Sequence, residues 1–424
     1  MERFDVIVIG GGPAGLMAAG RAAEAGRKVL LIEKNAGLGE KLLLAGKRRC
    51  NLTNALQDQD VFLSRYGARG GEFLRHVFSA FGPRETIAFF NRSGVRTVIE
   101  RGSRVFPEKS ETQDDELGGS QRVLECLLLY CKKGGVRFLR KTSVKALKLT
   151  GRGGPECRVD RIITNAEELS AERYIVATGG KSYPKTGSTG DGYRFACQAG
   201  HRIVKPTPAL VPVRTKETWI KLANRFNLRN VKLSAAVNGE LVDERFGEME
   251  FTNFGLSGAI VMELSSFVTD WMERGETTFI IDMKPALSQE KLVARIERDF
   301  EKFSDREFGR ALVDLAPSAV IPMILELSDV PPEKPVQYVS PEEKEDLAFL
   351  LKNITLTLNG LWSFDHAIVT KGGVELTEVD PKTMRSNLCE NLYFAGEVLD
   401  INGPTGGFNL QNCWSTGAVS GSAV

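Results

Sequence analysis

Three glycines near the N-terminus have the spacing of a dinucleotide-binding turn. Gly10, Gly12 and Gly15 fit the pattern G-x-G-x-x-G, directly after the apolar run 6–9. In such a turn the first glycine allows a tight bend, the second lets the backbone approach a pyrophosphate, and the third lets a helix pack closely on a strand. Glu33 lies eighteen positions after Gly15, where an acidic side chain accepts hydrogen bonds from a ribose 2′-OH. This spacing indicates dinucleotide binding.

A strand, a helix and a second strand must hold this turn. Residues 6–9 are typical of a strand that is buried on both faces. Residues 14–25 are rich in alanine and glycine, so the predicted helix can lie near the sheet with its positive end at the phosphates. Residues 29–32 predict the second strand, which ends at Glu33. The alternative, a glycine-rich turn that binds no nucleotide, leaves this register unexplained.

The composition describes an ordinary globular protein. The chain has 424 residues, of which 42% are apolar and 26% charged, and its formal net charge is +2. This length predicts two or three domains, and the charge makes neither nucleic acid nor a membrane a default partner. Seven cysteines without a C-x-x-C pair predict a reduced, cytoplasmic protein with no disulfide framework and no metal site. No apolar run approaches the ~20 residues that span a bilayer, and the oligomeric state stays open.

Two distant segments distinguish FAD from NAD. Residues 174–180 predict a buried strand that ends at Ala177, Thr178 and Gly179, and residues 391–397 predict another that ends at Gly396 and Glu397. A dehydrogenase that binds NAD needs only its one nucleotide domain, whereas a flavoprotein holds a long cofactor at both ends. Residues 403–410 can present backbone N–H groups and a helix N-terminus to a reduced flavin. This pattern favours FAD.

The remaining segments predict how the domains are divided. Residues 203–362 change in character, with short strands first and helices such as 288–303 afterwards. Ser340 and Pro341 predict the start of a further helix, and Asp191 predicts the N-cap of a helix that runs through Ala199. We expect an α/β fold. A discontinuous, split Rossmann-like FAD-binding domain would cover residues 1–202 and 363–424. An inserted β-plus-α domain would cover residues 203–362, with its β part at about 203–284 and 336–362 and its helical part at about 285–335.

Several motifs together resemble one family. They are Arg-Cys-Asn-Leu-Thr-Asn at 49–54, Ala-Thr-Gly-Gly-Lys-Ser-Tyr-Pro at 177–184, Phe-Thr-Asn-Phe-Gly-Leu-Ser-Gly at 251–258, and Thr-Gly-Gly-Phe-Asn-Leu-Gln at 405–411. With the N-terminal turn, they resemble the HI0933-like family of bacterial FAD-dependent flavoproteins, a branch of the glutathione-reductase-like and fumarate-reductase-like superfamily. The chain departs from the family pattern at Lys47-Arg48, where a glycine pair is usual, at Phe408, where tyrosine is common, and at Ala259, where proline is common.

The resemblance implies roles for individual residues. Gly12, Pro13 and Ala14 would contact the pyrophosphate, Glu33 the adenosine ribose and Val144 the adenine. Thr178 and Gly179 would line the cofactor, Glu397 and Asp400 would approach the ribitol and phosphates, and residues 407–410 would approach the ring. The other predicted cofactor-binding residues are Gly10, Gly15, Lys34, Lys41, Arg49, Cys50, Asn51, Ala177, Gly396, Gly406, Gly407, Phe408, Asn409 and Leu410.

Cys50 is the predicted catalytic residue. The neighbouring Arg48 and Arg49 would lower the pKa of its thiol, and the thiol would protonate the carbon left by hydride addition. A packing role is the alternative. The three histidines lack a partner pattern; His76 and His201 are expected to be structural, and His366 could face the cavity.

The resemblance implies an FAD-dependent oxidoreductase that reduces an activated C=C bond, since related flavoproteins act on steroid enones or on a uridine of large-subunit ribosomal RNA. The basic segment 213–232, with Trp219 and Phe226, keeps RNA open as a partner beside a small molecule; its alternative is a solvated face with core aromatics. A non-catalytic FAD-binding or RNA-associated factor is the third hypothesis. No second G-x-G-x-x-G occurs, so the sequence predicts no dedicated NAD(P)H domain, and the electron donor stays open between a transiently bound NAD(P)H and another reductant.

Overall fold

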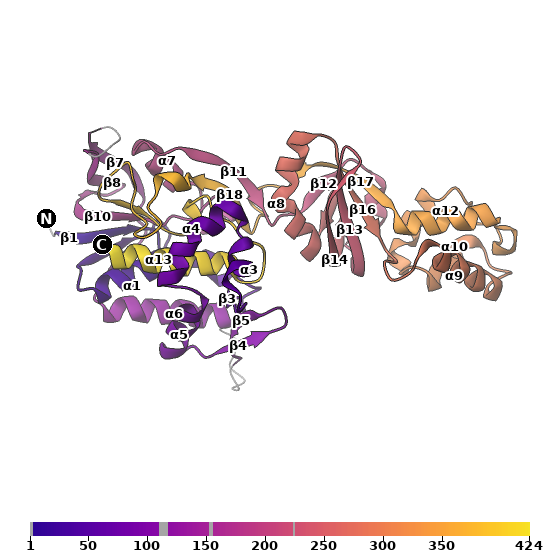
Figure 1. The fold of residues 1–424 in the computed structure, drawn as a ribbon, viewed down its shortest axis with the longest axis horizontal. Coiled ribbons are helices and arrows are strands. Elements are labelled where there is room, and N and C mark those ends of the chain that lie inside the picture. The colour runs from indigo at the N-terminus through magenta and orange to yellow at the C-terminus, as the bar shows by residue number, and fades with distance from the viewer. Residues whose placement is uncertain (1–2, 110–117, 152–155, 224) are drawn as a thin grey trace. The chain divides into compact units, whose positions relative to one another are not determined.

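A parallel sheet positions the glycine turn. In the computed structural model, which describes residues 3–109, 118–151, 156–223 and 225–424, five strands lie in the order β19-β10-β1-β2-β6. Their bounds are β1 Phe4–Ile9, β2 Val29–Ile32, β6 Arg137–Leu139, β10 Ala171–Val176 and β19 Leu392–Phe394 (Figure 1). The two N-terminal strands and the two distant strands predicted from the sequence are therefore neighbours in one sheet.

The side chains of β1 alternate between two layers. Val6 and Val8 belong to a core with α1 (Pro13–Glu24), α6 (Gly118–Lys133) and α13 (Phe408–Ala423). Ile7 and Ile9 belong to a second core, with α7 (Asp191–Gln198) and the hairpin of β7 (Val144–Thr150) and β8 (Arg158–Thr164). Because successive side chains of a strand point to opposite faces, a sheet that is covered on both faces requires a continuous apolar run.

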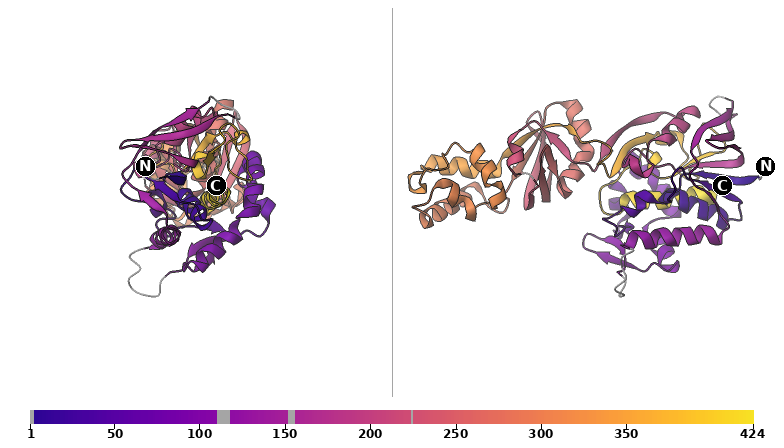
Figure 2. Two further views of the ribbon diagram at one scale, coloured as in Figure 1. Left: turned by 90° about the vertical axis from the view of Figure 1, so that its left-hand side faces the viewer. Right: turned by 180° about the vertical axis from the view of Figure 1, so that it is seen from behind.

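Helices from the two ends of the chain pack side by side on this sheet. α1 follows the glycine turn, α13 ends the chain, and the two are in extensive contact (Figures 1 and 2). The chain divides into a split unit, Met1–Pro208 with Ile368–Val424, and an inserted unit, Ala209–Ala367. The α/β class with a split Rossmann-like domain and an insert is confirmed.

Smaller elements complete the split unit. A three-stranded sheet has the order β3-β5-β4 (Thr53–Asn54, Arg104–Pro107 and Thr97–Glu100), and β9 (Glu168–Leu169) extends the β7–β8 hairpin. β11 (Ile203–Ala209) pairs with β18 (Val369–Val374). The remaining helices are α2 Glu40–Leu43, α3 Gln59–Ser64, α4 Gly67–Ala80 and α5 Pro83–Arg92.

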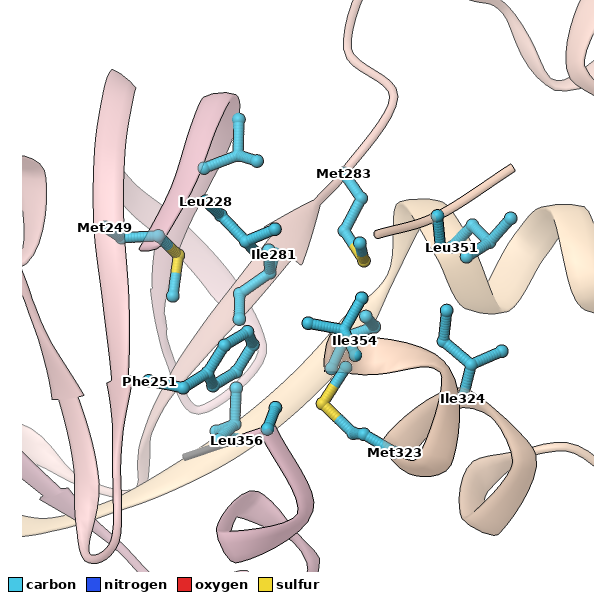
Figure 3. Close-up of a cluster of buried hydrophobic side chains, with 14 of the residues drawn as sticks. Leu228, Met249, Phe251, Ile281, Met283, Met323, Ile324, Leu351, Ile354 and Leu356 are labelled. Carbon is cyan, nitrogen blue, oxygen red and sulfur yellow. The ribbon is translucent and has the colours of Figure 1, made fainter. Parts of the chain in front are cut away.

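The inserted unit is built on a closed barrel, a topology that the sequence did not predict. Its strands lie in the order β12-β15-β14-β13-β16-β17, with bounds Val213–Thr215, Gly255–Ser257, Glu240–Thr252, Asn227–Val237, Thr277–Asp282 and Ile354–Leu361. Figure 3 shows Phe251, Ile281 and Leu356 from the barrel in one apolar cluster with Met323 and Leu351 from the helices. The barrel and its helices therefore share a core.

The helices of the inserted unit follow the sequence only in part. α9 (Gln289–Lys302) and α12 (Pro341–Lys352) lie where helices were predicted, and Ser340 forms a capping box with Glu343 at the start of α12. α10 (Phe308–Ala311) and α11 (Ile321–Leu327) are short. α8 (Ala259–Arg274) was not predicted, although its buried side chains Ile260, Leu264, Val268 and Trp271 have helical spacing.

Candidate FAD site

The three glycines of the turn lie in different surroundings. A Cβ atom at Gly10 would lie 2.4 Å from the Ala177 carbonyl oxygen, and one at Gly15 would lie 1.9 Å from the Gly10 carbonyl oxygen. Gly10 also has φ +109°, a conformation that favours glycine. A Cβ at Gly12 would meet no heavy atom within 4 Å. Gly10 and Gly15 therefore allow close packing, whereas Gly12 borders open space.

Gly12 borders a cavity of about 480 Å³ in the split unit. Its walls come from the glycine turn, the end of β2, α2 and the loop after it, the start of β7, the end of β10, and the first turns of α13. The cavity-lining residues predicted from the sequence are Gly10, Gly12, Pro13, Ala14, Glu33, Lys34, Lys41, Val144, Ala177, Thr178, Gly179, Glu397, Asn409 and Leu410. The fold thus brings residues from both ends of the chain to one cavity.

Glu33 is fixed at the end of β2 by backbone donors. One carboxylate oxygen accepts a hydrogen bond from the Gly11 N–H at 2.8 Å, and the other accepts one from the Asn35 N–H at 2.8 Å. Each carboxylate oxygen has two lone pairs, so the side chain can still accept hydrogen bonds from ligand hydroxyls. Thr178 also lines the cavity, and its buried hydroxyl has no hydrogen-bond partner among the described residues.

Asp191 is not the N-cap that the sequence predicted. Gly190 is the N-cap of α7, and the Asp191 carboxylate instead lies 2.7 Å from the Lys34 ammonium. Burial alone would raise the pKa of Asp191, but the hydrogen bond and charge of Lys34 outweigh it and hold the pKa below its usual value. Both residues line the cavity. The sequence could not show this ion pair, because Lys34 lies far from Asp191 along the chain and approaches it only in the folded protein.

A second ion pair connects the loop after β2 to the C-terminal segment. The Lys41 ammonium lies 2.6 Å from a Glu397 carboxylate oxygen and donates to the Ser182 hydroxyl at 2.6 Å. Glu397 also accepts hydrogen bonds from the Ser182 hydroxyl at 2.9 Å and from the Thr370 N–H at 2.8 Å. The side chains of Lys41 and Glu397 are 23% and 15% exposed. This network fixes two cavity walls against each other.

Other contacts of predicted residues hold the segment around the start of α13. Asn409 anchors the loop before α13, because its amide accepts from the Gly403 N–H at 2.9 Å and donates to the Gly403 carbonyl at 2.8 Å. The Phe408 ring packs on Phe62 with 4.8 Å between ring centroids. The predicted residues that do not line the cavity are Gly15, Arg49, Cys50, Asn51, Gly396, Asp400, Gly406, Gly407 and Phe408.

Asp400 and Asn51 lie outside the cavity in different settings. Burial raises the pKa of Asp400, and its backbone N–H donates to the Val374 carbonyl at 3.1 Å. With its amide oriented to match its neighbours, Asn51 accepts from the Gly407 N–H at 3.1 Å and donates to the Thr53 carbonyl at 3.1 Å. Asn51 therefore positions the start of α13.

The environment of Cys50 is the opposite of the predicted one. The residue is 0% exposed, and burial raises the pKa of its thiol to about 12 despite a hydrogen bond with Ser120. Arg49 does not stabilise a thiolate, because its guanidinium pairs with Glu100 and lies 4.2 Å from the centre of the Phe106 ring. The predicted lowering of the pKa is wrong, and we assign no proton transfer to Cys50.

This environment predicts how the thiols react. In the native protein near neutral pH, Cys50 is expected to resist a maleimide, because a buried thiol with a raised pKa forms no thiolate. Cys197 is exposed and is expected to react. Mass spectrometry of wild type and of the Cys197→Ser control, before and after unfolding, measures both sites. Rapid native labelling of Cys50 would contradict the buried placement.

Other cavity residues were missed in the sequence. Asn412 and Cys413 line the cavity from α13, three and four positions after Asn409, a spacing that places them on the same helical face. Burial raises the pKa of Cys413 to about 12. Ser143 and Tyr183 also line the cavity, from loops that carry no signal of it in the sequence.

None of the three histidines is among the residues that line the cavity. The buried His201 ring lies 2.6 Å from the Ser386 hydroxyl and 3.2 Å from the Glu378 carboxylate. This resembles a Ser-His-acid set, but Ser386 is buried and its hydroxyl accepts from the Cys389 N–H at 2.9 Å, so the set fixes a loop. His366 stacks on Trp362 within the inserted unit, with 4.2 Å between ring centroids.

In the basic segment of the inserted unit, both aromatic side chains are partly buried and two of the cations have carboxylate neighbours. Trp219 and Phe226 are partly buried against its core, so their faces are not free to stack on bases. Arg229 lies 3.8 Å from Glu248, and Lys232 lies 3.5 Å from Glu244. The partial burial of Trp219 and Phe226 favours the interpretation of this segment as a solvated face with core aromatics.

Within the described ranges, no helix is both long and apolar enough to cross a membrane. In the same part of the chain, no group of three or more His, Cys, Asp or Glu side chains is arranged to hold a metal ion.

Known proteins resemble this chain over its whole length. The family model of the HI0933-like protein Rossmann domain matches residues 4–423. A 3-dehydro-bile acid delta(4,6)-reductase of Clostridium scindens is 32% identical over 421 residues, which are 98% of each chain. A ribosomal RNA dihydrouridine synthase of Escherichia coli is 27% identical over 98% of this chain and 96% of its own.

A solved structure shares the fold. A 3-ketosteroid delta1-dehydrogenase of Sterolibacterium denitrificans has a TM-score of 0.55 at 13% identity and covers 99% of both chains. Together with the full-length family match, the cavity between the glycine turn and α13 leads to one conclusion. This chain belongs to the HI0933-like family of FAD-dependent oxidoreductases.

Proposed function

We propose that this protein reduces an activated C=C bond of a small molecule at the cavity of the split unit. The observation that carries this proposal is the 32% identity to a delta(4,6)-reductase over 98% of both chains. That similarity includes the inserted unit as well as the split unit, so it extends well beyond a shared nucleotide turn.

Three observations support FAD as the occupant of the cavity. Gly12 leaves open space at the N-terminus of α1, where backbone N–H groups and the helix dipole favour a pyrophosphate. Glu33 retains acceptor capacity for ribose hydroxyls, and the buried Thr178 hydroxyl is without a partner among the described residues. Bound FAD supplies the hydride chemistry of the family.

The residues of the chain then have separate tasks. Gly12, Pro13 and Ala14 would hold the pyrophosphate, and Val144 would hold the adenine side. Lys41 and Glu397 would fix the middle of the cavity. Asn409 and Leu410, at the first turn of α13, would orient the ring and present the positive end of the helix to developing negative charge. Apolar lining residues would exclude water, and these are Leu42, Leu44, Ile368, Ile401 and Leu410.

Anaerobic reduction of the purified holoenzyme tests the proposal. NADH and NADPH, each of which would bind only transiently, are tested as electron donors. The reduced flavin is then reoxidised with a panel of conjugated enones. We expect at least one donor to bleach the flavin absorbance and at least one enone to restore it. Flavin that no donor reduces would support the third hypothesis, a non-catalytic FAD-binding factor, and would contradict the proposal.

Reduction of a uridine in large-subunit ribosomal RNA is the second candidate function. The observation that favours it is the full-length similarity to a ribosomal RNA dihydrouridine synthase, at 27% identity. The chemistry is the same, since uridine has an activated C=C bond. Loss of dihydrouridine from the ribosomal RNA of a deletion strain would support this function, and an unchanged content would exclude it.

A further inference from the structure

One polar side chain of the cavity wall has a buried atom that no described residue satisfies. Asn412 is only 2% exposed, and its side-chain oxygen has no hydrogen-bond partner in the part of the chain that the structure describes. A buried acceptor without a donor is unfavourable, so such groups are nearly always paired in folded proteins. Because Asn412 lines the cavity, a ligand in the cavity can supply the missing donor.

The polar side chains one helical turn away from Asn412 are committed to other partners. The Thr416 hydroxyl donates to the backbone carbonyl of Asn412 at 2.6 Å and accepts from the Gly396 N–H at 2.9 Å. The Asn409 amide accepts from the Gly403 N–H at 2.9 Å and donates to the Gly403 carbonyl at 2.8 Å. Both side chains hold α13 against neighbouring loops, whereas the side chain of Asn412 does not.

Asn412 also differs from the other polar side chains of the cavity wall. Lys41 and Glu397 neutralise each other at 2.6 Å. Among the cavity-lining residues that the structure describes, only Thr178 has another buried side-chain oxygen or nitrogen without a partner. Thr178 follows β10 and Asn412 lies on α13, so two elements that are distant in the sequence each leave one polar atom to a ligand.

The turn of α13 that carries Asn412 lies near the start of α1. A Cβ atom at Gly417 would lie 2.5 Å from the Ala14 carbonyl oxygen, so this part of α13 passes close to the glycine turn. Asn409 and Leu410, which are proposed to orient the ring, lie nearer the N-terminus of α13. The part of FAD between its pyrophosphate and its ring is the ribityl chain, whose polar groups are hydroxyls.

The side-chain amide of Asn412 is suited to a hydroxyl group. It carries an acceptor oxygen and an NH₂ donor, and rotation about its last bond can turn either of them to the cavity. A hydroxyl can donate to the oxygen or accept from the nitrogen, whereas the oxygens of an ionised phosphate cannot donate. A hydroxyl can therefore satisfy the unpaired oxygen, and a pyrophosphate cannot.

We propose that Asn412 binds a ribityl hydroxyl group of FAD through its side-chain amide and thereby positions the middle of the cofactor. This inference rests on FAD as the occupant of the cavity, which is part of the proposed function, and it adds a residue to which no motif of the sequence gave a role. The unpaired amide oxygen destabilises the apoprotein, and bound FAD removes that penalty.

Analogues of FAD that lack one ribityl hydroxyl test this contact. The full-length apoproteins of wild type, Asn412→Ala and Asn412→Leu are titrated with FAD and with its 2′-, 3′- and 4′-deoxyribityl analogues, and quenching of flavin fluorescence gives each Kd. We expect one analogue to bind wild type about tenfold more weakly than FAD does, which corresponds to about 1.4 kcal/mol. Both variants are expected to bind FAD and that analogue equally, because their contact with the hydroxyl is already lost.

Gln411→Met is the matched control. Gln411 precedes Asn412 on α13, is 0% exposed, and also has a buried side-chain oxygen without a partner among the described residues, but it does not line the cavity. This variant is expected to bind FAD and every analogue as wild type does.

Thermal unfolding gives a readout that a merely structural role of Asn412 would not produce. Asn412→Leu leaves no polar atom unpaired, so the Tm of the apoprotein is expected to rise by about 2 °C while the affinity for FAD falls. A fall in both Tm and affinity would mean that Asn412 supports the fold, and it would contradict the inference.

The outcomes separate this inference from the proposed function. If each analogue loses the same affinity in wild type as in both Asn412 variants, the inference is overturned, since the amide then contributes nothing to ribityl binding. Weakened binding in Asn412→Leu with wild-type binding in Asn412→Ala would also overturn it, because the larger side chain would then only block the cofactor. These titrations involve no turnover, so the inference can fail while enone reduction stands. If wild type binds neither FAD nor any analogue, both proposals fail.

Discussion

Replacement of Gly12 by valine is expected to give a folded protein that does not bind FAD. A Cβ at this position meets no heavy atom within 4 Å, and the backbone, with φ −82° and ψ −174°, is an extended conformation that valine adopts readily. The added side chain would occupy the space through which the pyrophosphate approaches α1. We expect FAD affinity to fall at least ~100-fold, or about 2.7 kcal/mol.

Gly15→Val is the informative comparison. Its Cβ would lie 1.9 Å from the Gly10 carbonyl oxygen, so the helix must move away from the strand. This variant is expected to lose FAD, and its free energy of unfolding is expected to fall by ~2 kcal/mol or more. Flavin absorbance per protein and thermal unfolding of the apoprotein separate the two effects. Full FAD content in Gly12→Val would show that the cofactor binds elsewhere.

The second large effect is expected when the ion pair between Lys41 and Glu397 is broken, and it is an effect on stability. Lys41→Met leaves the Glu397 carboxylate without its cation, although Ser182 and the Thr370 N–H still bind it. Removing one partner of a largely buried pair costs more than removing both, because the remaining charge is left uncompensated. We expect Lys41→Met to lower the free energy of unfolding by about 2 kcal/mol. This loss is smaller than that at a fully buried pair, since both side chains retain some exposure.

A double-mutant cycle measures this coupling. Urea unfolding of the apoprotein would compare Lys41→Met, Glu397→Gln and the double variant, and we expect the double variant to recover part of the loss. The exposed pair of Arg3 and Glu172, 3.5 Å apart, is the control. Its coupling energy in the same kind of cycle is expected to be ~0.5 kcal/mol or less. Strictly additive effects at Lys41 and Glu397 would contradict the coupling.

The sequence predicted the sheet well because its strands are buried on both faces. Such strands need continuous apolar runs, and residues 6–9, 29–32 and 391–397 all have them. The barrel of the inserted unit could not be predicted in the same way. β13 and β14 are long, interrupted by shifts in register, and exposed on one side, so their apolar pattern is irregular. The buried side chains of α8 have the spacing of a helix, but the sequence analysis did not predict this helix.

The predicted site residues also divide into those that local sequence places correctly and those whose surroundings depend on the folded structure. Glycines and strand ends, such as Gly12, Glu33 and Thr178, lie at the cavity because local geometry fixes their positions. Cys50 was misjudged since neighbours in the sequence do not determine burial: the adjacent Arg49 pairs with Glu100, while the thiol turns into the core. Asp191 was misjudged for the same reason, because its partner Lys34 is brought near only by folding.

A single-turnover experiment tests the central claim most directly. Holoenzyme reduced with dithionite under anaerobic conditions would be mixed with a 3-oxo-4,6-dienoic bile acid in a stopped-flow instrument. We predict that the flavin reoxidises at a rate that saturates with the acid, and that one C=C bond is reduced per flavin, as measured by mass spectrometry of the product. Flavin that stays reduced until oxygen is admitted, with this acid and a panel of other enones unchanged, would contradict the claim.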